Sequence, residues 1–365
     1  MSNAVTWVEV SRAALKANYE ALLSAVSENI LLMPVIKSNA YGHGLLQVAR
    51  ALPKKRRWGF VVAETDEALL LRRVYPRERI LLLSNFAFED IPDLAAKQID
   101  LAVYTEAQLP QLRRAQHAHI HVKVDTGTTR TGFLPRDLKL VARFLQQHKD
   151  IALAGVFSHF ADSEGSKSAF TTTQIHRFKK ALTELPRPEI SHIACSAASL
   201  RYSKAHFGAI RPGIALYGLW PSESTKKAAS ALALKPVLEW KARVLQTKAV
   251  PAGTTIGYGR TYAMKRKGKV AVLPIGYGDG FDRALSNTAE VLVRGKRAKV
   301  AGRVCMNVTM IDVSHIPGVK TGDEVVLIGK QGKEEVSVEE MAKHAGTINY
   351  EITTRIRESL PRIIV

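Results

Sequence analysis

The chain has 365 residues, enough for about two domains with large cores, and 46% of them are hydrophobic, which is typical of a globular protein. Lysine and arginine exceed aspartate and glutamate by twenty (53 − 33), but they are scattered and no nucleic-acid motif accompanies them, so we predict no nucleic-acid partner. No apolar run reaches the roughly 18 residues of a membrane span, no signal-peptide pattern opens the chain, and two distant cysteines suggest neither disulfides nor a metal site, which together predict a cytoplasmic protein.

Eight short apolar runs alternate with amphipathic stretches over residues 1–215. In the first amphipathic stretch Leu15, Tyr19 and Leu22 recur at helical spacing, with Ser11 placed to cap the helix, and Ser168–Leu185 has the same period. The apolar runs, which we predict to be strands, are Ile30–Ile36, Trp58–Ala63, Ile80–Leu83, Ile99–Val103, His119–Val124, Ile151–Phe157, Ile190–Ala194 and Ala209–Arg211. This alternation predicts an α/β fold with an N-terminal (β/α)8 TIM barrel, and a doubly wound sheet is the alternative.

The pattern changes near Pro221–Pro236, which is rich in Ser, Lys and Ala and which we predict to be a linker. Arg294-Gly295-Lys296 is typical of a hairpin tip, and Ser337 with Glu340 predicts a capping box at the start of one helix. The β-type runs of this part are Val237–Val250, Lys269–Pro274, Glu290–Val293, Ala298–Val304, Val308–Val313 and Glu324–Ile328. We therefore predict a barrel domain over residues 1–232 and a mostly-β C-terminal domain over residues 233–365.

The first predicted strand ends at Lys37, followed by Ser38-Asn39-Ala40-Tyr41-Gly42-His43-Gly44. A lysine at the end of a strand is usually a solvated charge. Catalytic groups of TIM barrels, however, sit at the carboxyl ends of the strands. A buried lysine also shifts its pKa readily and then serves as an amine nucleophile. Lys37 is therefore a candidate catalytic residue.

Charged residues and a histidine follow two more of the predicted strands. Lys123 and Asp125 alternate along the chain, so their side chains share one face, and an ion pair inside the barrel is the ordinary structural explanation. Arg130 lies in the next loop, and His159 follows the sixth run. A lone histidine is more often structural than catalytic, so these residues gain interest mainly from their position at strand ends.

The seventh and eighth runs end in groups suited to a phosphate. Ser196 opens a short helix, and barrels commonly bind phosphate at a helix N-terminus in these two loops. Gly213 lets the backbone come close to a ligand, and Gly213 and Ile214 offer N–H donors where Pro212 has none. A plain helix cap is the alternative role for Ser196.

In the second domain, Tyr258 and Tyr277 each lie between glycines, a setting more typical of turns or of the core than of chemistry. Taken in chain order, however, these segments resemble alanine racemases, which are homodimeric pyridoxal-phosphate enzymes built from a barrel and a β domain. The resemblance covers essentially the whole chain, and its segments are Asn39–Gly44, His121–Gly127, Gly155–Ala161, His192–Ala198, Arg211–Ile214 with Tyr217-Gly218, Ile256–Gly259 with Ile275–Gly280, and Gly302–Asn307 with Thr347–Glu351.

The resemblance implies a reaction as well as a fold: interconversion of L- and D-alanine, which supplies D-alanine for peptidoglycan. Racemisation removes a proton from one face of the α-carbon and returns one to the other, so two groups are needed. The family's pair corresponds to Lys37 and Tyr258, and the tyrosine comes from the partner subunit of the dimer. The resemblance implies no metal.

Further roles also follow from the resemblance. Pyridoxal phosphate would contact Lys37, Tyr41, His159, His192, Ser196, Arg211, Gly213, Ile214 and Tyr350. Alanine would contact Arg130, Met306, Tyr258 and Tyr277. In the family the position of Arg211 faces the pyridine nitrogen of the cofactor, and His192 orients Arg211. The position of Lys123 is often carbamylated and then anchors Arg130.

The chain departs from the family pattern at Thr128-Thr129 in place of Met-Gly, at Cys195 in place of Asn, and at Asn307 in place of Asp. Three alternatives stay open. The first is a racemase for several amino acids, because one methylene in an apolar pocket changes binding by only about 1–3 kcal/mol. The others are a non-catalytic pyridoxal-phosphate binder, which would lack the β domain, and a decarboxylase of related fold, whose Cys-Asp arrangement is replaced here by Cys305-Met306.

Overall fold

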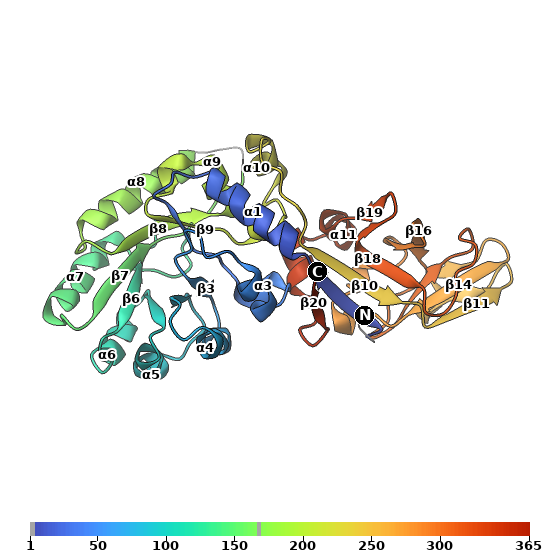
Figure 1. Ribbon diagram of the computed structural model, residues 1–365, viewed down its shortest axis with the longest axis horizontal. Coiled ribbons are helices and arrows are strands. Elements are labelled where there is room, and N and C mark those ends of the chain that lie inside the picture. Colours follow the sequence, from blue (N-terminus) through green and yellow to red (C-terminus); the bar gives the residue numbers. More distant parts are fainter. Residues whose placement is uncertain (1–3, 166–168) are drawn as a thin grey trace. The chain divides into compact units, whose positions relative to one another are not determined.

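The computed structural model describes residues 4–165 and 169–365, and the chain divides into two compact units (Figure 1). The barrel unit consists of Ala14–Ala40 and Val48–Lys235. The β unit consists of the described residues up to Ala13, together with Tyr41–Gln47 and Pro236–Val365. The β unit therefore contains both ends of the described chain and one short segment that follows the first barrel strand.

All eight strands predicted for the barrel are present, and they form one parallel sheet. The sheet runs in the order β2-β9-β8-β7-β6-β5-β4-β3. Parallel bridges from Leu32 to Arg57 and from Val35 to Val61 connect the β2 segment with the β3 segment, so the two edges of the sheet meet. The strands are β2 (Leu31–Leu32), β3 (Phe60–Val62), β4 (Ile80–Leu82), β5 (Asp100–Val103), β6 (His119–Lys123), β7 (Ala152–Phe157), β8 (Ile190–Cys195) and β9 (Ala209–Arg211). The prediction of a barrel is confirmed.

Amphipathic helices connect these strands. In α1, the expected residues Leu15, Tyr19 and Leu22 are fully buried. The predicted helix Ser168–Leu185 corresponds to α8, and its first residue, Ser168, lies outside the described residues. The helices of this part of the chain are α1 (Arg12–Ser24), α2 (Lys37–Tyr41), α3 (Leu45–Ala51), α4 (Thr65–Val74), α5 (Ile91–Ala96), α6 (Leu109–Leu112), α7 (Leu138–Gln147), α8 (Ala169–Thr183), α9 (Ser196–Arg201) and α10 (Glu223–Ala228).

The segment Pro221–Pro236, which we predicted to be a linker, ends where the chain passes from the barrel unit to the β unit, and it also contains the short helix α10. Ser222 caps the helix, and its hydroxyl accepts a hydrogen bond from the backbone N–H of Thr225 over 3.1 Å. Thr225 is itself fully buried. A single buried residue leaves little apolar periodicity, which explains why the sequence pattern did not reveal this helix.

The β unit is built on a ten-stranded sheet in the order β11-β14-β17-β16-β15-β18-β10-β1-β20, with β19 paired to β18. Every predicted β-type run overlaps a strand, and Val237–Val250 contains two. The strands are β1 (Thr6–Val10), β10 (Leu238–Arg243), β11 (Gln246–Val250), β14 (Gly268–Leu273), β15 (Glu290–Val293), β16 (Lys296–Val300), β17 (Thr309–Asp312), β18 (Glu324–Gln331), β19 (Glu334–Val336) and β20 (Arg362–Ile364). A small hairpin, β12 (Thr255–Ile256) with β13 (Tyr262–Ala263), and the helices α11 (Val338–Ala345) and α12 (Asn349–Thr354) complete the unit.

Two local predictions in the β unit have different outcomes. Arg294 and Gly295 have φ angles of 52° and 71° and connect the paired residues Val293 and Lys296, so the hairpin tip is confirmed. Ser337 accepts from the backbone N–H of Glu340 over 3.0 Å, as expected for a cap. The carboxylate of Glu340, however, pairs with Arg297 over 2.6 Å, so this half of the predicted capping box is wrong.

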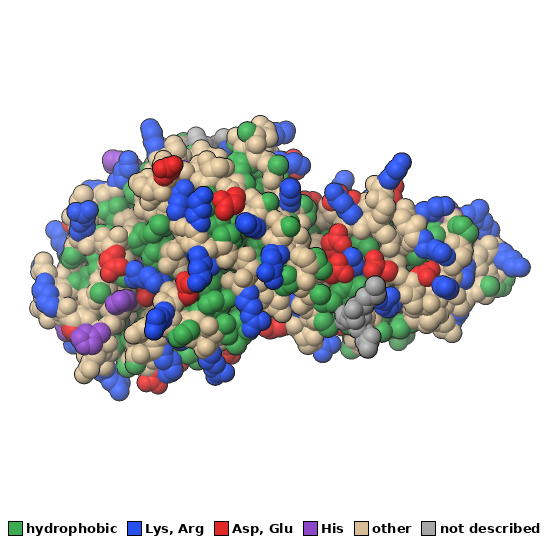
Figure 2. All heavy atoms as spheres, viewed as in Figure 1, with side chains coloured by type: hydrophobic (Ala, Val, Ile, Leu, Met, Phe, Trp, Pro, Cys, Tyr) green, Lys and Arg blue, Asp and Glu red, His purple; other side chains and the backbone are tan. Residues whose placement is uncertain are grey.

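Lys and Arg side chains are spread over the face shown in Figure 2, with acidic side chains between them, and do not gather into one patch. Within the described chain, none of the helices combines the length and the apolarity that crossing a bilayer requires.

Candidate active site

Lys37 lies where the first barrel strand turns into a left-handed bend. Ser38, Asn39, Ala40 and Tyr41 all have φ angles of 52° or 53°. This conformation costs an L-residue roughly 1–2 kcal/mol, so four in succession are unusual. Strain of this kind is concentrated at functional sites, where the surrounding structure holds it in place.

Glu67, from α4, binds the backbone of this bend. Its carboxylate accepts the backbone N–H of Asn39 over 2.8 Å, and also those of Ala63 and Glu64. Burial raises the pKa of Glu67, and these backbone donors oppose that rise. Sequence reasoning did not single out Glu67; its position one helical turn after the end of β3 was the available signal.

The mouth of the barrel collects cationic side chains. Burial lowers the pKa of Lys37, and the charge of Arg130 lowers it further. Burial, followed by the charges of Arg130 and Arg211, lowers the pKa of Lys123 to about 8. His159 lies among all four cations, and burial together with their charges lowers its pKa to about 3. The site therefore has an excess of positive charge that an anionic ligand would compensate.

Lys123, at the end of β6, donates a hydrogen bond from Nζ to Thr131 Oγ1 and lies 5.8 Å from the centre of the Phe157 ring. Asp125 accepts the backbone N–H groups of Gly127, Thr128 and Thr129 instead of binding Lys123 directly. The sequence suggested an ion pair between Lys123 and Asp125, but Asp125 instead binds the backbone of the loop that follows it.

Arg211, at the end of β9, is 5% exposed and held on several sides. It donates to His192 Nδ1 over 2.5 Å, to the His192 carbonyl over 2.8 Å and to the Ser158 carbonyl over 2.7 Å. Its guanidinium lies 5.3 Å from the centre of the Phe157 ring. Burial lowers the pKa of Arg211 to about 10, so it still carries its charge at neutral pH. His192 thus lies where a residue that orients Arg211 must lie.

The predicted phosphate-binding residues come together. Ser196 Oγ accepts the backbone N–H of Gly213 over 2.9 Å and that of Ala215 over 3.3 Å, which ties the start of α9 to the loop after β9. With these two bonds accepted, the hydroxyl hydrogen of Ser196 can be donated to a phosphate oxygen. Gly213 already donates its N–H to Ser196, and Ile214 begins the next helical turn. Nearby, the Sγ of Cys195 lies 3.2 Å from Ser163 Oγ.

The remaining candidates belong to the β unit. Tyr258 is 72% exposed, Met306 57% and Tyr277 44%. Backbone hydrogen bonds from Tyr277 N to Cys305 O (3.0 Å) and from Gly278 N to Met306 O (2.8 Å) bring two of these loops together. The third loop is close by, because a Cβ on Gly302 would lie 2.5 Å from the carbonyl oxygen of Ile256.

Tyr41 and Tyr350, also in the β unit, pack with ring centroids 6.2 Å apart. The structure thus forms two clusters of predicted residues, one in each unit. The barrel cluster contains Lys37, Lys123, Arg130, His159, His192, Ser196, Arg211, Gly213 and Ile214. The second contains the exposed Tyr258, Tyr277 and Met306, with Tyr41 and Tyr350 as a separate pair.

The barrel cluster fits pyridoxal phosphate, the cofactor that the resemblance implies. A desolvated lysine amine can attach an aldehyde. The excess of positive charge suits a phosphate and a substrate carboxylate, and Arg211 offers donors to a ring nitrogen. Sequence reasoning missed Thr131 and Phe157, which contact Lys123 and Arg211, because their positions become meaningful only when neighbouring strands are aligned.

Comparison with known proteins agrees with this geometry. The model of the alanine racemase N-terminal domain matches residues 10–221, and that of the C-terminal domain matches residues 237–364. The alanine racemase of Halothermothrix orenii is 38% identical over 98% of this chain and 96% of its own length, and that of Carboxydothermus hydrogenoformans is 39% identical over 98% and 99%. Among solved structures, the alanine racemase of E. faecalis has a TM-score of 0.93 at 34% identity over 99% of this chain and 98% of its own. The Bacillus anthracis enzyme with bound L-Ala-P has a TM-score of 0.92 at 34% identity over 100% and 96%. The chain belongs to the alanine racemase family.

Proposed function

We propose that this protein is a pyridoxal-phosphate-dependent alanine racemase that interconverts L- and D-alanine. The observation that carries the proposal is the desolvated amine of Lys37 at the carboxyl end of a barrel strand, beside Arg130 and in a site that also contains the cations of Lys123 and Arg211. The relatives that share more than a third of its residues over nearly its whole length bear the same name.

When bound, pyridoxal phosphate withdraws electrons from the α-carbon of the amino acid and so makes the α-proton acidic. The Nζ of Lys37 would hold the cofactor, and the same amine would accept or return the α-proton on one face. Its lowered pKa favours this step because more of the amine is neutral and able to accept a proton. Arg130 binds the substrate carboxylate, and Ser196 with the Gly213–Ile214 loop holds the phosphate.

Arg211 would donate to the pyridine nitrogen and, because arginine keeps its proton, would leave that nitrogen unprotonated. The cofactor would then withdraw electrons less strongly, which would favour return of the α-proton over side reactions. The second proton-transfer group in the proposal is Tyr258, whose exposed position on the β unit leaves it available to a partner subunit in a two-fold homodimer.

Lys123 is proposed to be carbamylated. Its pKa of about 8 raises the fraction of neutral amine that can react with carbon dioxide, and the product is an anion among cations. Carbon-13 NMR after equilibration with labelled bicarbonate tests this proposal. A protected carbamate signal that is absent from Lys123→Met supports it, and identical spectra for both proteins refute it.

The proposed reaction is tested by incubating the protein, loaded with pyridoxal phosphate, with L-alanine in deuterium oxide, with L-serine and L-lysine in parallel. We expect D-alanine that carries deuterium at the α-carbon, and little change in the other two. Comparable turnover of serine or lysine would identify a racemase for several amino acids. Lack of exchange with all three would leave a non-catalytic cofactor binder.

In the cell, the proposed enzyme acts in the cytoplasm, and its product D-alanine enters peptidoglycan. A strain in which this is the sole racemase gene should need D-alanine for growth once the gene is deleted, and growth without the supplement would contradict this role.

A further inference from the structure

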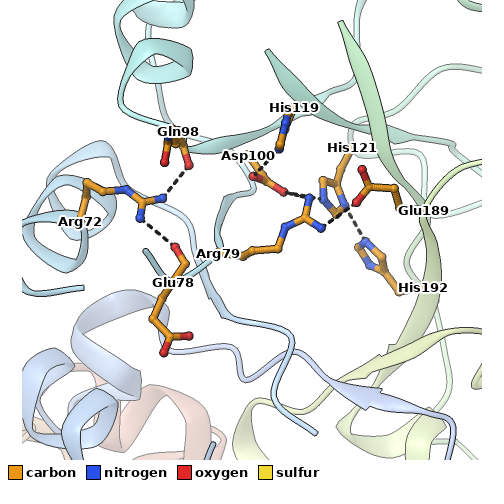
Figure 3. Close-up of polar contacts among 9 residues, drawn as sticks. All are labelled: Arg72, Glu78, Arg79, Gln98, Asp100, His119, His121, Glu189 and His192. Carbon is orange, nitrogen blue, oxygen red and sulfur yellow. Dashed lines mark hydrogen bonds and ion pairs between the residues drawn. The ribbon is translucent and has the colours of Figure 1, made fainter. Parts of the chain in front are cut away.

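A continuous chain of polar side chains leads from Arg211 into the barrel and ends near its opposite face. Figure 3 shows the part of it that runs from His192 through His121 to Asp100. His192 in β8 contacts His121 in β6 through Nε2 and Nδ1, 2.9 Å apart. His121 Nε2 lies 3.3 Å from Asp100 Oδ2, and the same oxygen accepts from Arg79 over 2.8 Å. Arg79 also pairs with Glu189 over 2.7 Å. The chain crosses the barrel from the carboxyl end of β9 to residues that begin or precede strands.

The chemistry of the two ends fixes the direction of every hydrogen bond in this chain. Arg211 has only donors, so Nδ1 of His192 must accept. A neutral His192 then carries its proton on Nε2 and donates it to Nδ1 of His121. A neutral His121 therefore carries its own proton on Nε2 and donates it to Asp100. A carboxylate can only accept, so the chain ends there without conflict.

Burial keeps both imidazole rings neutral, as this arrangement requires. His121 and His192 are fully buried. Burial lowers the pKa of both, and for His121 it outweighs the opposing effect of Asp100, so both rings are neutral at pH 7. A protonated His192 would also present N–H groups on both nitrogens, one of them aimed at Arg211.

The backbone of β7 is shaped to let this chain pass. Gly155 lies opposite His121, and a Cβ on Gly155 would be 2.1 Å from His121 Nδ1. The absence of a side chain there allows the imidazole to cross β7 and reach β8. Trp58 packs edge-on against His121, and Phe157 stacks on His192, so both rings are also fixed laterally.

We propose that Asp100 is a positioning residue for Arg211 and acts through His121 and His192. By accepting from His121, Asp100 favours the Nε2–H tautomer of both rings. His192 Nδ1 is then free of a proton and accepts from the guanidinium of Arg211. The importance of this for catalysis rests on the proposed function, because Arg211 matters there as the donor to the cofactor ring. The tautomers themselves do not depend on it. The competing explanation is that Asp100, Arg79 and Glu189 only stabilise the far face of the barrel.

The tautomers can be measured directly in the intact protein. Long-range proton–nitrogen correlation spectra of protein with ring-labelled histidine distinguish Nδ1–H, Nε2–H and doubly protonated rings, and His121→Gln assigns two of the rings by the signals it removes or shifts. We expect neutral Nε2–H rings for both His121 and His192 at neutral pH. An Nδ1–H ring or an imidazolium at either position would overturn the proposal.

Asp100→Asn tests the role of the carboxylate, with Glu189→Gln as the matched control. Both changes replace a carboxylate bonded to Arg79 by an amide, but only Asp100 contacts His121. An amide can donate as well as accept, so Asp100→Asn leaves Arg211 as the only end that fixes the direction of the hydrogen bonds, and the reverse direction then costs only the bond from Arg211 to His192 Nδ1. We expect mixed tautomers at His192, retained cofactor binding and a kcat lower by about tenfold, as is common for loss of a supporting contact.

In the control, tautomers and kcat should remain as in the wild type. Gly155→Ala displaces the His121 ring while leaving Asp100 intact, and it should reproduce the effect of Asp100→Asn on the His192 tautomer and on kcat. A purely stabilising role predicts lower melting temperatures in these variants with unchanged tautomers and kcat, and that result would refute the proposal. An inactive wild type with the expected tautomers would refute the proposed function instead.

Discussion

His159 shows how a single residue responds to the charge collected at the barrel mouth. It is surrounded by four cationic side chains: Lys37 and Arg130 from the segments after β2 and β6, and Lys123 and Arg211 from the ends of β6 and β9. Protonating its ring would add a fifth positive charge in a largely buried place, so the folded protein keeps the imidazole neutral. The same neutral ring can accept a hydrogen bond from a hydroxyl, which suits its proposed position beside a proton-transferring tyrosine.

The first prediction concerns pH and stability. The pKa of His159 is about 3 in the folded protein against an ordinary value of 6.5. Between these values the unfolded chain binds a proton that the folded chain does not, so the free energy of unfolding should decrease as the pH falls below about 6.5. Urea unfolding of the cofactor-free protein at about pH 7 and at about pH 5 measures this decrease.

His159→Gln is the control for this prediction. The variant should lose less stability over the same interval, although it keeps the contributions of His121 and His192, whose pKa values are also lowered. An equal decrease in both proteins would mean that His159 does not contribute.

At the scale of elements, the sequence identified the interior of each unit better than its connections. The barrel strands were recognised because they are buried on both sides and therefore continuously apolar. β1 was missed because the polar residues Thr6 and Glu9 interrupt the pattern of its apolar residues, Trp7, Val8 and Val10. Its partners, β10 and β20, also lie far along the chain, and pairing over such distances leaves no local pattern.

The site shows the same division. The strand-end motifs could be found because chemistry-bearing residues follow apolar runs directly. The chain from Arg211 to Asp100 could not, because it depends on which residues of β5, β6 and β8 lie side by side and on a missing side chain at Gly155. Nothing local in the sequence connects His121 with a residue 71 positions away.

A second prediction belongs to α11. Ser337→Ala removes the hydroxyl that accepts from the N–H of Glu340, and it should destabilise the protein by about 1 kcal/mol in thermal or urea unfolding. Ser337→Asp keeps an acceptor at the same place and should preserve most of the stability. The ion pair between Glu340 and Arg297 remains in both variants, so equal losses would show that the cap contributes little.

At the scale of the whole molecule, the two proposed proton-transfer groups belong to different units. Lys37 is in the barrel unit and Tyr258 in the β unit. If the partner subunit supplies the tyrosine, each site of a dimer uses Lys37 of one protomer and Tyr258 of the other. An inactive variant at Lys37 and an inactive variant at Tyr258 should then complement one another in a mixed dimer.

The third prediction follows from this arrangement. Lys37→Ala and Tyr258→Phe homodimers should each be nearly inactive, and Lys37→Ala should also lose the visible absorbance of attached cofactor. Mixed dimers contain one site that lacks both groups and one that has both, so refolding equal amounts together should restore up to about a quarter of wild-type activity by random pairing. Verified mixed dimers without activity would argue that the site is formed within one chain.

The position of β1 also determines the order in which the protein can be assembled during its synthesis. β1 lies between β10 and β20, and β10 begins 228 positions (238 − 10) after β1 ends. At about 5–20 residues per second, a ribosome needs roughly 10 to 50 s to make this interval. β20 begins a further 119 residues (362 − 243) after β10 ends. The barrel segments made in that time can fold as they emerge, but the hydrogen-bonding edges of β1 stay unpaired until β10 and β20 have been synthesised. Translation speed and chaperones that cover short apolar segments should therefore affect the yield of this enzyme more through its first strand than through its barrel.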